Sequence, residues 1–538
     1  MPRNVTSYHS LRKVVKRFTF SLTELRRSLG GFNRLFSLTL DNGKEVVVRM
    51  PFKNAGPRTL LTQSEVATMD FLRTKLRFPI PKVLAWNASP NNPVGCEYMI
   101  MEQCSGEMLA NRVDSPSQVS MFAAEIAEMQ TRLASIKFSQ YGSIYYKDNV
   151  SPELQARPLY AKGEPEDECS ERFRIGPSVD RRFYRSERAH MQIDRGPCKI
   201  PFTSSQNRVL NPLNFLGIDI NSYIRAGAAC EIDWINKFRD SESAQNQVGA
   251  RHGHERHLSL LRNWISLSPA ILPPARLCRP SITHPDFHAA NVFVSTDSNT
   301  PSISGLIDWQ NATVRPLFET VLPSVFDVSA TDVPHITLTG DFEDPLLPSN
   351  IDDLDEDAVD EIQNEVDKFS LMRHYLTLIR DINPDLITAM RFEHMEHLRR
   401  ALYYSSHSWS DGLPLLEQTL MQICSSYGKE IPVHKDFPTC PISFTDKDRE
   451  RHQKEFKTVV RREALLEEFV HKLMKKAGII LHRDGSVPVE QYEQAKQALP
   501  GIFAKITAKC NPEQIEETKL LWPLREGKFD MSAESCVK

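Results

Sequence analysis

The sequence predicts an α+β fold in which a small, mainly antiparallel sheet precedes a larger and mainly helical region. Strand-like segments joined by tight-turn residues come first, from about residue 30 onward, and amphipathic segments of helix length dominate beyond about residue 360. The chain has 538 residues, of which 40% are hydrophobic, which is enough to build a two-lobed globular protein with insertions.

The first expected element is a β-hairpin. Segments 32–40 and 45–50 are rich in apolar and β-branched residues, and the Asp-Asn-Gly string at 41–43 is a strong tight-turn signal. A further apolar strand is predicted over residues 98–101. Together these strands would form the antiparallel sheet.

Helices are expected beside this sheet. After Pro57, the pattern Thr62-x-x-Glu65 matches a capping box, which would begin a helix whose apolar residues share one face. Ser115-Pro116 marks the expected start of a second helix.

The remainder of the chain is less regular at first and helical toward its end. Residues 145–255 are polar and rich in Arg, Pro and Ser, and we interpret them as an irregular insertion or cap with short helical pieces. The acidic run at 352–361 is expected to open a helix that continues toward residue 380, and residues 446–477 form another amphipathic segment of helix length.

The overall charge and the cysteines argue against several classes of protein. Lys and Arg number 66 against 69 Asp and Glu, a formal net charge of −3, so nothing at whole-chain level indicates a nucleic-acid partner. The ten cysteines include no Cys-x-x-Cys pair, which argues against a zinc ribbon or a dense disulfide framework. Since no run of about eighteen apolar residues is present, we expect no transmembrane segment.

The first 23 residues have the composition of a mitochondrial presequence. They carry five basic residues and several Ser and Thr, no acid occurs before Glu24, and their apolar residues share one face of a possible helix. The alternative is an exposed basic helix at the start of the chain. The expected localisation is therefore mitochondrial, and otherwise cytoplasmic.

The string that most clearly indicates chemistry is His284-Pro-Asp286-Phe-His288-Ala-Ala-Asn291, followed by two apolar strands, the second of which ends at Asp308. Asp286 would deprotonate an attacking hydroxyl, while Asn291 and Asp308 offer oxygen ligands for magnesium on the ATP phosphates. We interpret His284 as a brace for the loop rather than a proton carrier. Asp and Asn are also ordinary turn residues, but their joint order and spacing favour phosphoryl transfer.

This string resembles the catalytic loop of the aminoglycoside phosphotransferase and choline kinase group of small-molecule kinases. Further strings resemble the fungal "altered inheritance of mitochondria" phosphotransferase-like family, at 30–34, 64–69, 142–146, 154–160, 173–178 and 304–310. The likeness spans most of the chain from about residue 30. It implies a protein-kinase-like fold with two lobes, ATP and Mg2+ as cofactors, and a hydroxyl of an unidentified small molecule as the acceptor.

The resemblance also assigns roles around the nucleotide. Gly30 and Gly31 would begin the loop over the triphosphate, where the lack of Cβ lets backbone N–H groups approach closely. Glu102 to Cys104 would form the hinge that offers backbone groups to adenine.

Arg49 stands where kinases of this group carry a phosphate-binding lysine, and Glu65 stands where they carry its partner on a helix. The arginine departs from the general pattern. Its guanidinium is permanently charged and can bind phosphate through two N–H groups, but it is larger than an ammonium group. Glu65 has the alternative role of capping-box acid.

These assignments divide the chain into a basic segment 1–28, an N-lobe 29–106 and a helical C-lobe 107–538 that carries the catalytic loop 281–310. The sequence gives no indication of the oligomeric state.

Three features leave alternatives open. The arginine-rich segment 172–195 is consistent with binding of an anionic substrate or nucleotide phosphates, and equally with a solvated helical face. In the histidine-rich segment 252–257, the spacing His-Glu-x-His is one residue shorter than the His-Glu-x-x-His zinc pattern. We therefore interpret this segment as a loop. The Ser/Asn/Pro-rich stretch 198–216 interrupts the resemblance and is consistent with a translated intron.

Two other functions remain as alternatives. A nucleotide-binding scaffold or regulator in mitochondria, with little or no turnover, would be compatible with Arg49, but a mere nucleotide sensor has less need of Asp286. A protein kinase is disfavoured, because Asp-Trp-Gln stands at 308–310 in place of Asp-Phe-Gly.

Overall fold

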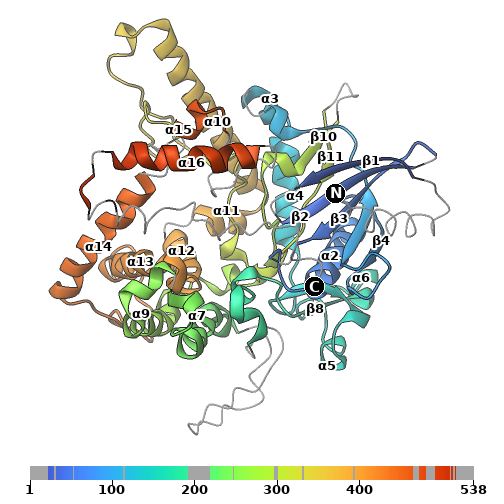
Figure 1. The fold of residues 1–538 in the computed structure, drawn as a ribbon, viewed down its shortest axis with the longest axis horizontal. Helices are drawn as coiled ribbons and strands as arrows, with labels where there is room; N and C mark the ends of the chain where they lie inside the picture. Colours follow the sequence, from blue (N-terminus) through green and yellow to red (C-terminus); the bar gives the residue numbers. More distant parts are fainter. Residues whose placement is uncertain are drawn as a thin grey trace. The chain divides into compact units, whose positions relative to one another are not determined.

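The computed structural model confirms an α+β fold, with an antiparallel sheet near the N-terminus and a mainly helical region after it (Figure 1). The residues that it describes are 22–29, 32–40, 42–52, 54–112, 116–191, 195, 219–245, 247–295, 301–329, 332–391, 394–464, 472–479, 491–508, 510–512 and 515. They form two compact units. The first takes in the described residues of Met1–Ser28, Phe32–Ala226 and Leu272–Glu396, and the second those of Leu29–Gly31, Gly227–Ile271 and His397–Lys538.

The first unit begins with a five-stranded sheet in the order β1-β2-β3-β5-β4 (Figure 1, blue). Its strands are β1 (Leu22–Leu29), β2 (Asn33–Leu40), β3 (Glu45–Pro51), β4 (Val83–Asn87) and β5 (Tyr98–Glu102). The predicted hairpin is confirmed, because β2 and β3 pair antiparallel and Gly43 adopts a φ of +76° in the turn between them. Glycine takes this left-handed conformation without the steric cost of a Cβ.

Helix α2 (Leu60–Leu76) contacts β4 and β5 and carries Glu65. It begins at Leu60, before Thr62, so the capping-box prediction is wrong. The Thr62 hydroxyl instead donates to the Glu97 carboxylate at 2.8 Å, and Glu65 pairs with Arg49. Because this turn of the helix is buried, both polar side chains make tertiary contacts rather than cap the helix.

The helix expected from Ser115-Pro116 is interrupted. It forms α3 (Pro116–Ser120) and α4 (Ala123–Ser135), with the fully buried Phe122 between them. Its amphipathic pattern continues across the interruption, which is why the sequence predicted a single helix.

The acidic run begins a helix as predicted. Helix α10 (Glu356–Ile382) starts after Asp355, whose carboxylate accepts the N–H of Ala358 at 2.9 Å. Further along, α10 packs against α4, where the Tyr375 hydroxyl donates to the side-chain oxygen of Gln130. The short helix α11 (Pro384–Arg391) follows and also contacts α10.

The segment interpreted as irregular, 145–255, contains a pair of strands and one long helix, and a second helix begins at its end. Strands β7 (Ser143–Tyr146) and β8 (Phe173–Gly176) pair antiparallel, and α7 (Ile220–Phe238) and α9 (His254–Leu267) are helices of 19 and 14 residues. The strands were missed because each is only four residues long, and polar residues and glycine dilute the helical period of α7. The stretch 198–216 lies outside the described residues.

Strand β7 and the short helix α6 (Glu168–Arg172), which precedes β8, contact helix α2. The Asp70 carboxylate accepts a hydrogen bond from the Tyr146 hydroxyl at 2.7 Å and forms an ion pair with Arg172. Lys75 of the same helix forms an ion pair with Asp167. The helix that carries Glu65 is therefore tied to two segments other than the sheet.

Short antiparallel strands carry the residues around the expected catalytic loop. Strand β9 (Pro280–Ile282) pairs with β12 (Val314–Pro316), while β10 (Val292–Val294) pairs with β11 (Ile303–Leu306) and β6 (Glu107–Met108). The loop from 283 to 291 joins β9 to β10, and Asp308 follows β11. This is the order of strand, turn and strand that the sequence predicts.

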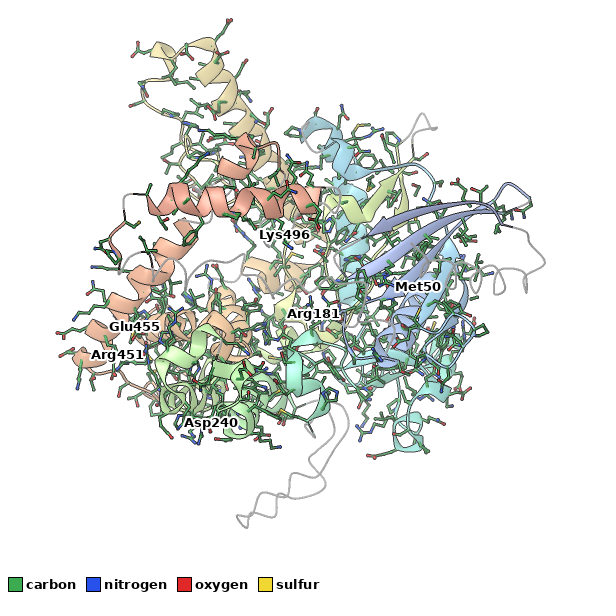
Figure 2. The ribbon with its side chains drawn as sticks, viewed as in Figure 1. Met50, Arg181, Asp240, Arg451, Glu455 and Lys496 are labelled. Atoms are coloured by element: carbon green, nitrogen blue, oxygen red, sulfur yellow. The ribbon has the colours of Figure 1, made fainter. Side chains whose placement is uncertain are left out.

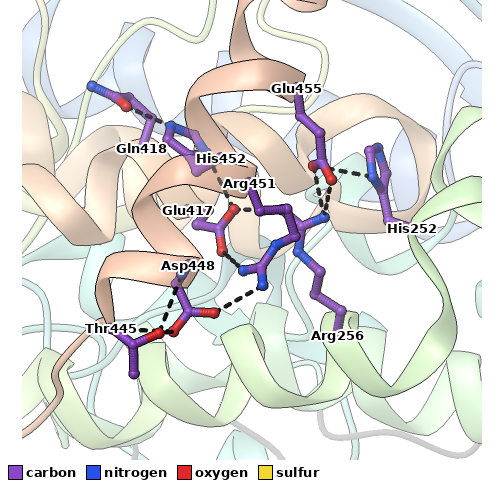
Figure 3. A network of polar contacts seen from close by, with 9 residues as sticks. All are labelled: His252, Arg256, Glu417, Gln418, Thr445, Asp448, Arg451, His452 and Glu455. Carbon is purple, nitrogen blue, oxygen red and sulfur yellow. Dashed lines mark hydrogen bonds and ion pairs between the residues drawn. The ribbon is translucent and has the colours of Figure 1, made fainter.

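The described part of the second unit is mainly helical, and Figure 3 shows the polar network that joins three of its helices. These are α9, α13 (Leu413–Ser426) and α14 (Asp446–Ala464). The buried carboxylate of Glu417 on α13 accepts hydrogen bonds from Arg256 of α9 and from Arg451 and His452 of α14. Such multiple pairing offsets the cost of burying a carboxylate.

Besides most of α7, the described part of the second unit includes further helices. They are α8 (Glu242–Gln245), most of α12 (Met395–Ser405), α15 (Lys472–Lys476) and α16 (Tyr492–Thr507). The amphipathic segment expected over 446–477 begins as predicted with α14 and includes α15, but residues 465–471 between them lie outside the described part.

The loop predicted over 252–257 is wrong, because α9 begins at His254. His252 lies 3.5 Å from the Glu455 carboxylate, and the buried His257 ring contacts the Ser408 hydroxyl at 3.3 Å and the Gly249 carbonyl at 2.9 Å. Among the residues that the structure describes, no cluster of three acidic, histidine or cysteine side chains is placed to hold a metal ion. No helix among them combines the length and apolar character that a membrane span requires.

Candidate functional site

His284 is the buried centre of the loop between β9 and β10. Its Nδ1 accepts the N–H of Asp286 at 3.1 Å, and its Nε2 donates to the carbonyl of Ile307 at 2.8 Å. Burial lowers its pKa from 6.5 to about 4, so the ring is neutral at physiological pH. The ring packs edge-on against Trp309, with 4.5 Å between the ring centroids. This geometry supports the interpretation of His284 as a brace between the loop and the end of β11.

Asp286 presents an exposed carboxylate at the tip of this loop, with 68% of its side chain accessible. The His288 ring lies 3.4 Å from its Oδ2. A hydrogen bond from His288 lowers the pKa of Asp286, and the same bond raises the pKa of His288. The carboxylate is therefore ionised and accessible at neutral pH, as a base requires. Sequence reasoning gave no role to His288, although it stands within the motif.

Asn291 is oriented by the same loop. Its Nδ2 donates to the main-chain oxygen of Asp286 at 2.9 Å, and its own main-chain oxygen accepts the N–H of Ile307 at 3.0 Å. Its amide oxygen accepts no hydrogen bond from the residues that the structure describes. The nitrogen is thus committed to the protein, while the oxygen is left for a ligand.

Asp308 lies at the end of β11 in a left-handed conformation, with φ of +64°. Aspartate adopts this conformation more readily than most residues, although it carries a steric cost. The side chain is 39% exposed, and its Oδ1 accepts a hydrogen bond from Arg49 at 2.6 Å. Its second carboxylate oxygen is therefore the one that would face a cation.

Arg49 of β3 is buried between two carboxylates. Its Nη1 donates to Glu65 of α2, and its Nη2 donates to Asp308. Only 5% of Arg49 and 3% of Glu65 is exposed. Burial by itself would lower the pKa of Arg49, but the charges of Glu65 and Asp308 raise it above its ordinary value. The structure thus brings together three residues that the sequence predicted for one site.

Glu65 is the more easily neutralised member of this group. Burial raises its pKa, Arg49 lowers it and the negative charge of Asp308 raises it, with the result that the pKa is about 7. The guanidinium stays charged, so a change of protonation near neutral pH falls on Glu65.

A reciprocal pair of amides links the start of β2 to the end of the catalytic region, and sequence reasoning missed it. Nδ2 of Asn33 donates to Oε1 of Gln310 at 3.0 Å, and Nε2 of Gln310 donates to Oδ1 of Asn33 at 3.2 Å. Both side chains are buried. Asn33 follows the predicted glycine loop and Gln310 follows Asp308, so adjacency to two motifs was the available signal.

The structure describes the residues of the predicted hinge but not the two glycines of the predicted phosphate loop. Glu102 is exposed at the end of β5, and its carboxylate accepts the N–H of Lys82 at 3.0 Å. Cys104 packs against β11, where a Cβ on Gly305 would lie 2.6 Å from its Sγ. Burial raises the pKa of the Cys104 thiol to about 11, so it stays protonated. Gly30 and Gly31 lie outside the described residues.

The arginines of segment 172–195 contact other groups of the protein. Arg172 pairs with Asp70, Arg182 pairs with Asp180, and Arg174 donates to main-chain oxygens. Arg181 (labelled in Figure 2) stacks over the ring of Phe32, with 4.1 Å from the guanidinium carbon to the ring centroid. These contacts give the segment a structural role, and they place Arg181 beside the start of β2.

The profile of the phosphotransferase enzyme family matches residues 224–321. A subtelomeric hrmA-associated cluster protein of Aspergillus fumigatus is 30% identical over 442 residues, covering 78% of this chain and 82% of that protein. The mitochondrial "altered inheritance of mitochondria protein 9" of Debaryomyces hansenii is 28% identical over 311 residues, covering 55% of this chain and 48% of that protein.

Two solved structures are also similar. One is a thermostable mutant of the aminoglycoside phosphotransferase APH(4)-Ia in complex with ADP and hygromycin B, with a TM-score of 0.34 and 14% identity over 77% of this chain and 97% of that one. The other is the macrolide 2'-phosphotransferase MphH of Brachybacterium faecium, with a TM-score of 0.32 and 12% identity over 77% of this chain and 96% of that one.

The amide pair generates a prediction about stability. We expect Asn33→Ala or Gln310→Ala to lower the free energy of unfolding by about 1–3 kcal/mol, because each leaves a buried amide without its partner. The double variant should cost less than the sum of the two single variants. Urea denaturation of the four proteins measures this coupling, with the exposed Asn91→Ala as control. Additive losses would show that the two amides do not interact.

His284 generates a prediction about pH. Its folded pKa of about 4 lies below the ordinary 6.5, so its contribution to stability is present above pH 6.5 and is lost as the pH falls toward 4. Between pH 7 and 4, the stability difference between wild type and His284→Asn should shrink by on the order of 3 kcal/mol. Denaturation at several pH values measures it, with the exposed His374→Asn as control. A difference that stays constant with pH would contradict a neutral, buried His284.

Proposed function

The chain belongs to the phosphotransferase enzyme family, among the relatives of the altered inheritance of mitochondria proteins, and from this premise we propose that it transfers the γ-phosphate of ATP to a hydroxyl of a small molecule. The observation that carries the proposal is the geometry of one loop. The amide nitrogen of Asn291 donates to the main-chain oxygen of Asp286 at 2.9 Å, so one loop presents both the exposed Asp286 carboxylate and the Asn291 amide oxygen. A base and a metal ligand held in one loop serve phosphoryl transfer.

Asp286 would act on the acceptor hydroxyl. Its lowered pKa keeps it ionised, so it can orient the hydroxyl and take its proton as the oxygen attacks. The hydrogen bond to His284 Nδ1 fixes the main chain at this residue. Such a base is typically worth about 10²- to 10⁴-fold in rate.

Asn291 and Asp308 would hold magnesium. One neutral and one charged oxygen donor suit a hard cation that also binds phosphate oxygens and water. The amide oxygen of Asn291, which has no partner among the described residues, and the partly exposed carboxylate of Asp308 fit this requirement. The bound ion would neutralise the charge that develops on the transferring phosphate.

Arg49 favours the second candidate, a nucleotide-binding protein with little or no turnover. Both terminal nitrogens of its guanidinium already bind carboxylates, and its buried Nε has no hydrogen-bond partner among the described residues. Binding of a phosphate by Arg49 would therefore require at least one of these ion pairs to rearrange. Turnover decides between the two candidates.

We also propose a mitochondrial location, with the cytoplasm as the alternative. The support is the likeness to relatives that are named as mitochondrial proteins, together with the basic composition of the first 23 residues. Detection of the tagged full chain in purified mitochondria, protected from added protease, tests this placement.

Asp286→Asn and Asp308→Ala separate chemistry from binding. We expect wild type to be stabilised against heat by ATP, and more strongly so with magnesium. Asp286→Asn should keep this stabilisation but lose at least about 10²-fold in ATP-dependent phosphorylation of a metabolite extract, because only the base is removed. Asp308→Ala should lose the magnesium-dependent part of the stabilisation.

Asp240→Asn, at an exposed carboxylate in the second unit, is the matched control and should behave as wild type (Figure 2). Unchanged phosphorylation by Asp286→Asn would refute its role as base. Stabilisation by MgATP without any phosphorylated product would favour the second candidate. Absence of stabilisation by ATP under every condition would count against both.

A further inference from the structure

Two cysteine side chains lie against one another in the second unit, whereas every described residue assigned above to phosphoryl transfer belongs to the first unit. Cys424 belongs to the last turn of α13, and Cys440 lies in the segment that leads from α13 to α14. Their sulfur atoms are 3.2 Å apart, and both residues are partly exposed. A disulfide bond is about 2.05 Å long, so closing this pair requires the sulfurs to approach by roughly 1 Å.

The segment between the cysteines is folded by its own hydrogen bonds. The Tyr427 hydroxyl donates to the carbonyl of Phe437 at 2.6 Å, and the N–H of Gly428 donates to the carbonyl of Ile431 at 2.8 Å. Gly428 has a φ of +76°, a conformation that suits glycine. These bonds keep Cys440 opposite the helix without any contribution from the sulfur atoms.

Both ends of the same segment are anchored. On α13, Glu417 binds Arg451 and His452 of α14, which fixes the start of the following helix (Figure 3). Close to Cys440, the thiol of Cys424 lies 3.7 Å from the carbonyl of Ile442, and Ile442 itself is buried. Contacts at both ends of the segment between α13 and α14 therefore keep the two thiols close together.

We propose that Cys424 and Cys440 form a reversible intramolecular disulfide, with a small-molecule disulfide of the glutathione type as the oxidant. Burial raises the pKa of the Cys424 thiol, so the first attack falls to Cys440. The Cys440 thiolate attacks one sulfur of the oxidant, which releases the first thiolate and leaves a mixed disulfide.

The second step closes the bond within the protein. Cys424, after loss of its proton, attacks the Cys440 sulfur of the mixed disulfide and releases the second thiolate. The two protons lost by the cysteines are taken up by the two thiols that leave, so two cysteine thiols are oxidised and one small disulfide is reduced.

The expected consequence is a change in stability rather than in chemistry. The bond closes a loop between residues 424 and 440, which restricts the unfolded chain and should raise the Tm of the second unit by several degrees. No residue of the candidate phosphotransfer site lies in this loop.

The test uses the full chain, first reduced and then equilibrated with oxidised glutathione. We expect a peptide that joins Cys424 to Cys440 in a non-reducing digest, loss of alkylation at both residues, and a rise in Tm that a reductant reverses. Cys440→Ser should abolish the link and the rise in Tm, while Cys424→Ser should leave glutathione attached to Cys440.

Cys510→Ser, at another partly exposed cysteine, is the matched control and should keep both the link and the rise in Tm. Full alkylation of both thiols after equilibration with the oxidant would overturn the proposal. So would a link from either residue to a different cysteine, or a mixed disulfide on wild-type Cys440 that never resolves.

Discussion

The guanidinium of Arg49 is buried between two carboxylates that come from different elements of the first unit. Glu65 lies on helix α2, and Asp308 lies at the end of strand β11. A buried charge is tolerable only when it is paired and hydrogen-bonded, so neither neighbour can move far without a large cost. The positions of β3, α2 and the end of β11 are therefore set together, and the carboxylate proposed to bind magnesium is part of that arrangement.

The other contacts of the region reinforce this constraint. Asn33 and Gln310 exchange two hydrogen bonds next to Asp308, and His284 ties the loop of Asp286 to the carbonyl of Ile307. Helix α2 is also held by Asp70 through Tyr146 and Arg172. A strained residue with positive φ, such as Asp308, persists when its surroundings determine its position in this way.

The sequence predicted the parts of the site that depend on local pattern. The order of strand, loop and strand around Asp286, Asn291 and Asp308 was predictable because chain neighbours place these residues. Glu65 shows the limit of such reasoning. It matched a capping box three residues after Thr62, but its partner, Arg49, comes from a strand and not from its own helix.

Long-range pairing was beyond the reach of pattern reasoning. Asn33 and Gln310 are 277 positions apart, and nothing in the composition near either residue indicates that its amide needs a buried partner. Helix α7 was missed for a different reason. Its glycine and polar residues weaken the helical period in the sequence, and the helix is stabilised instead by packing of Trp234 against Trp409. Tertiary contacts decided both cases.

If Arg49 positions Asp308 to bind magnesium with ATP, removal of the guanidinium should abolish the effect of magnesium on nucleotide affinity. The measurement is the affinity of Arg49→Met for ATP with and without magnesium. The variant is suited to the test, because the pKa of Glu65 is already about 7 and its carboxylate can take up a proton when the guanidinium is removed. In wild type and in the control Arg58→Met, magnesium should tighten ATP binding; in Arg49→Met this gain should disappear. An equal gain from magnesium in all three proteins would contradict the account.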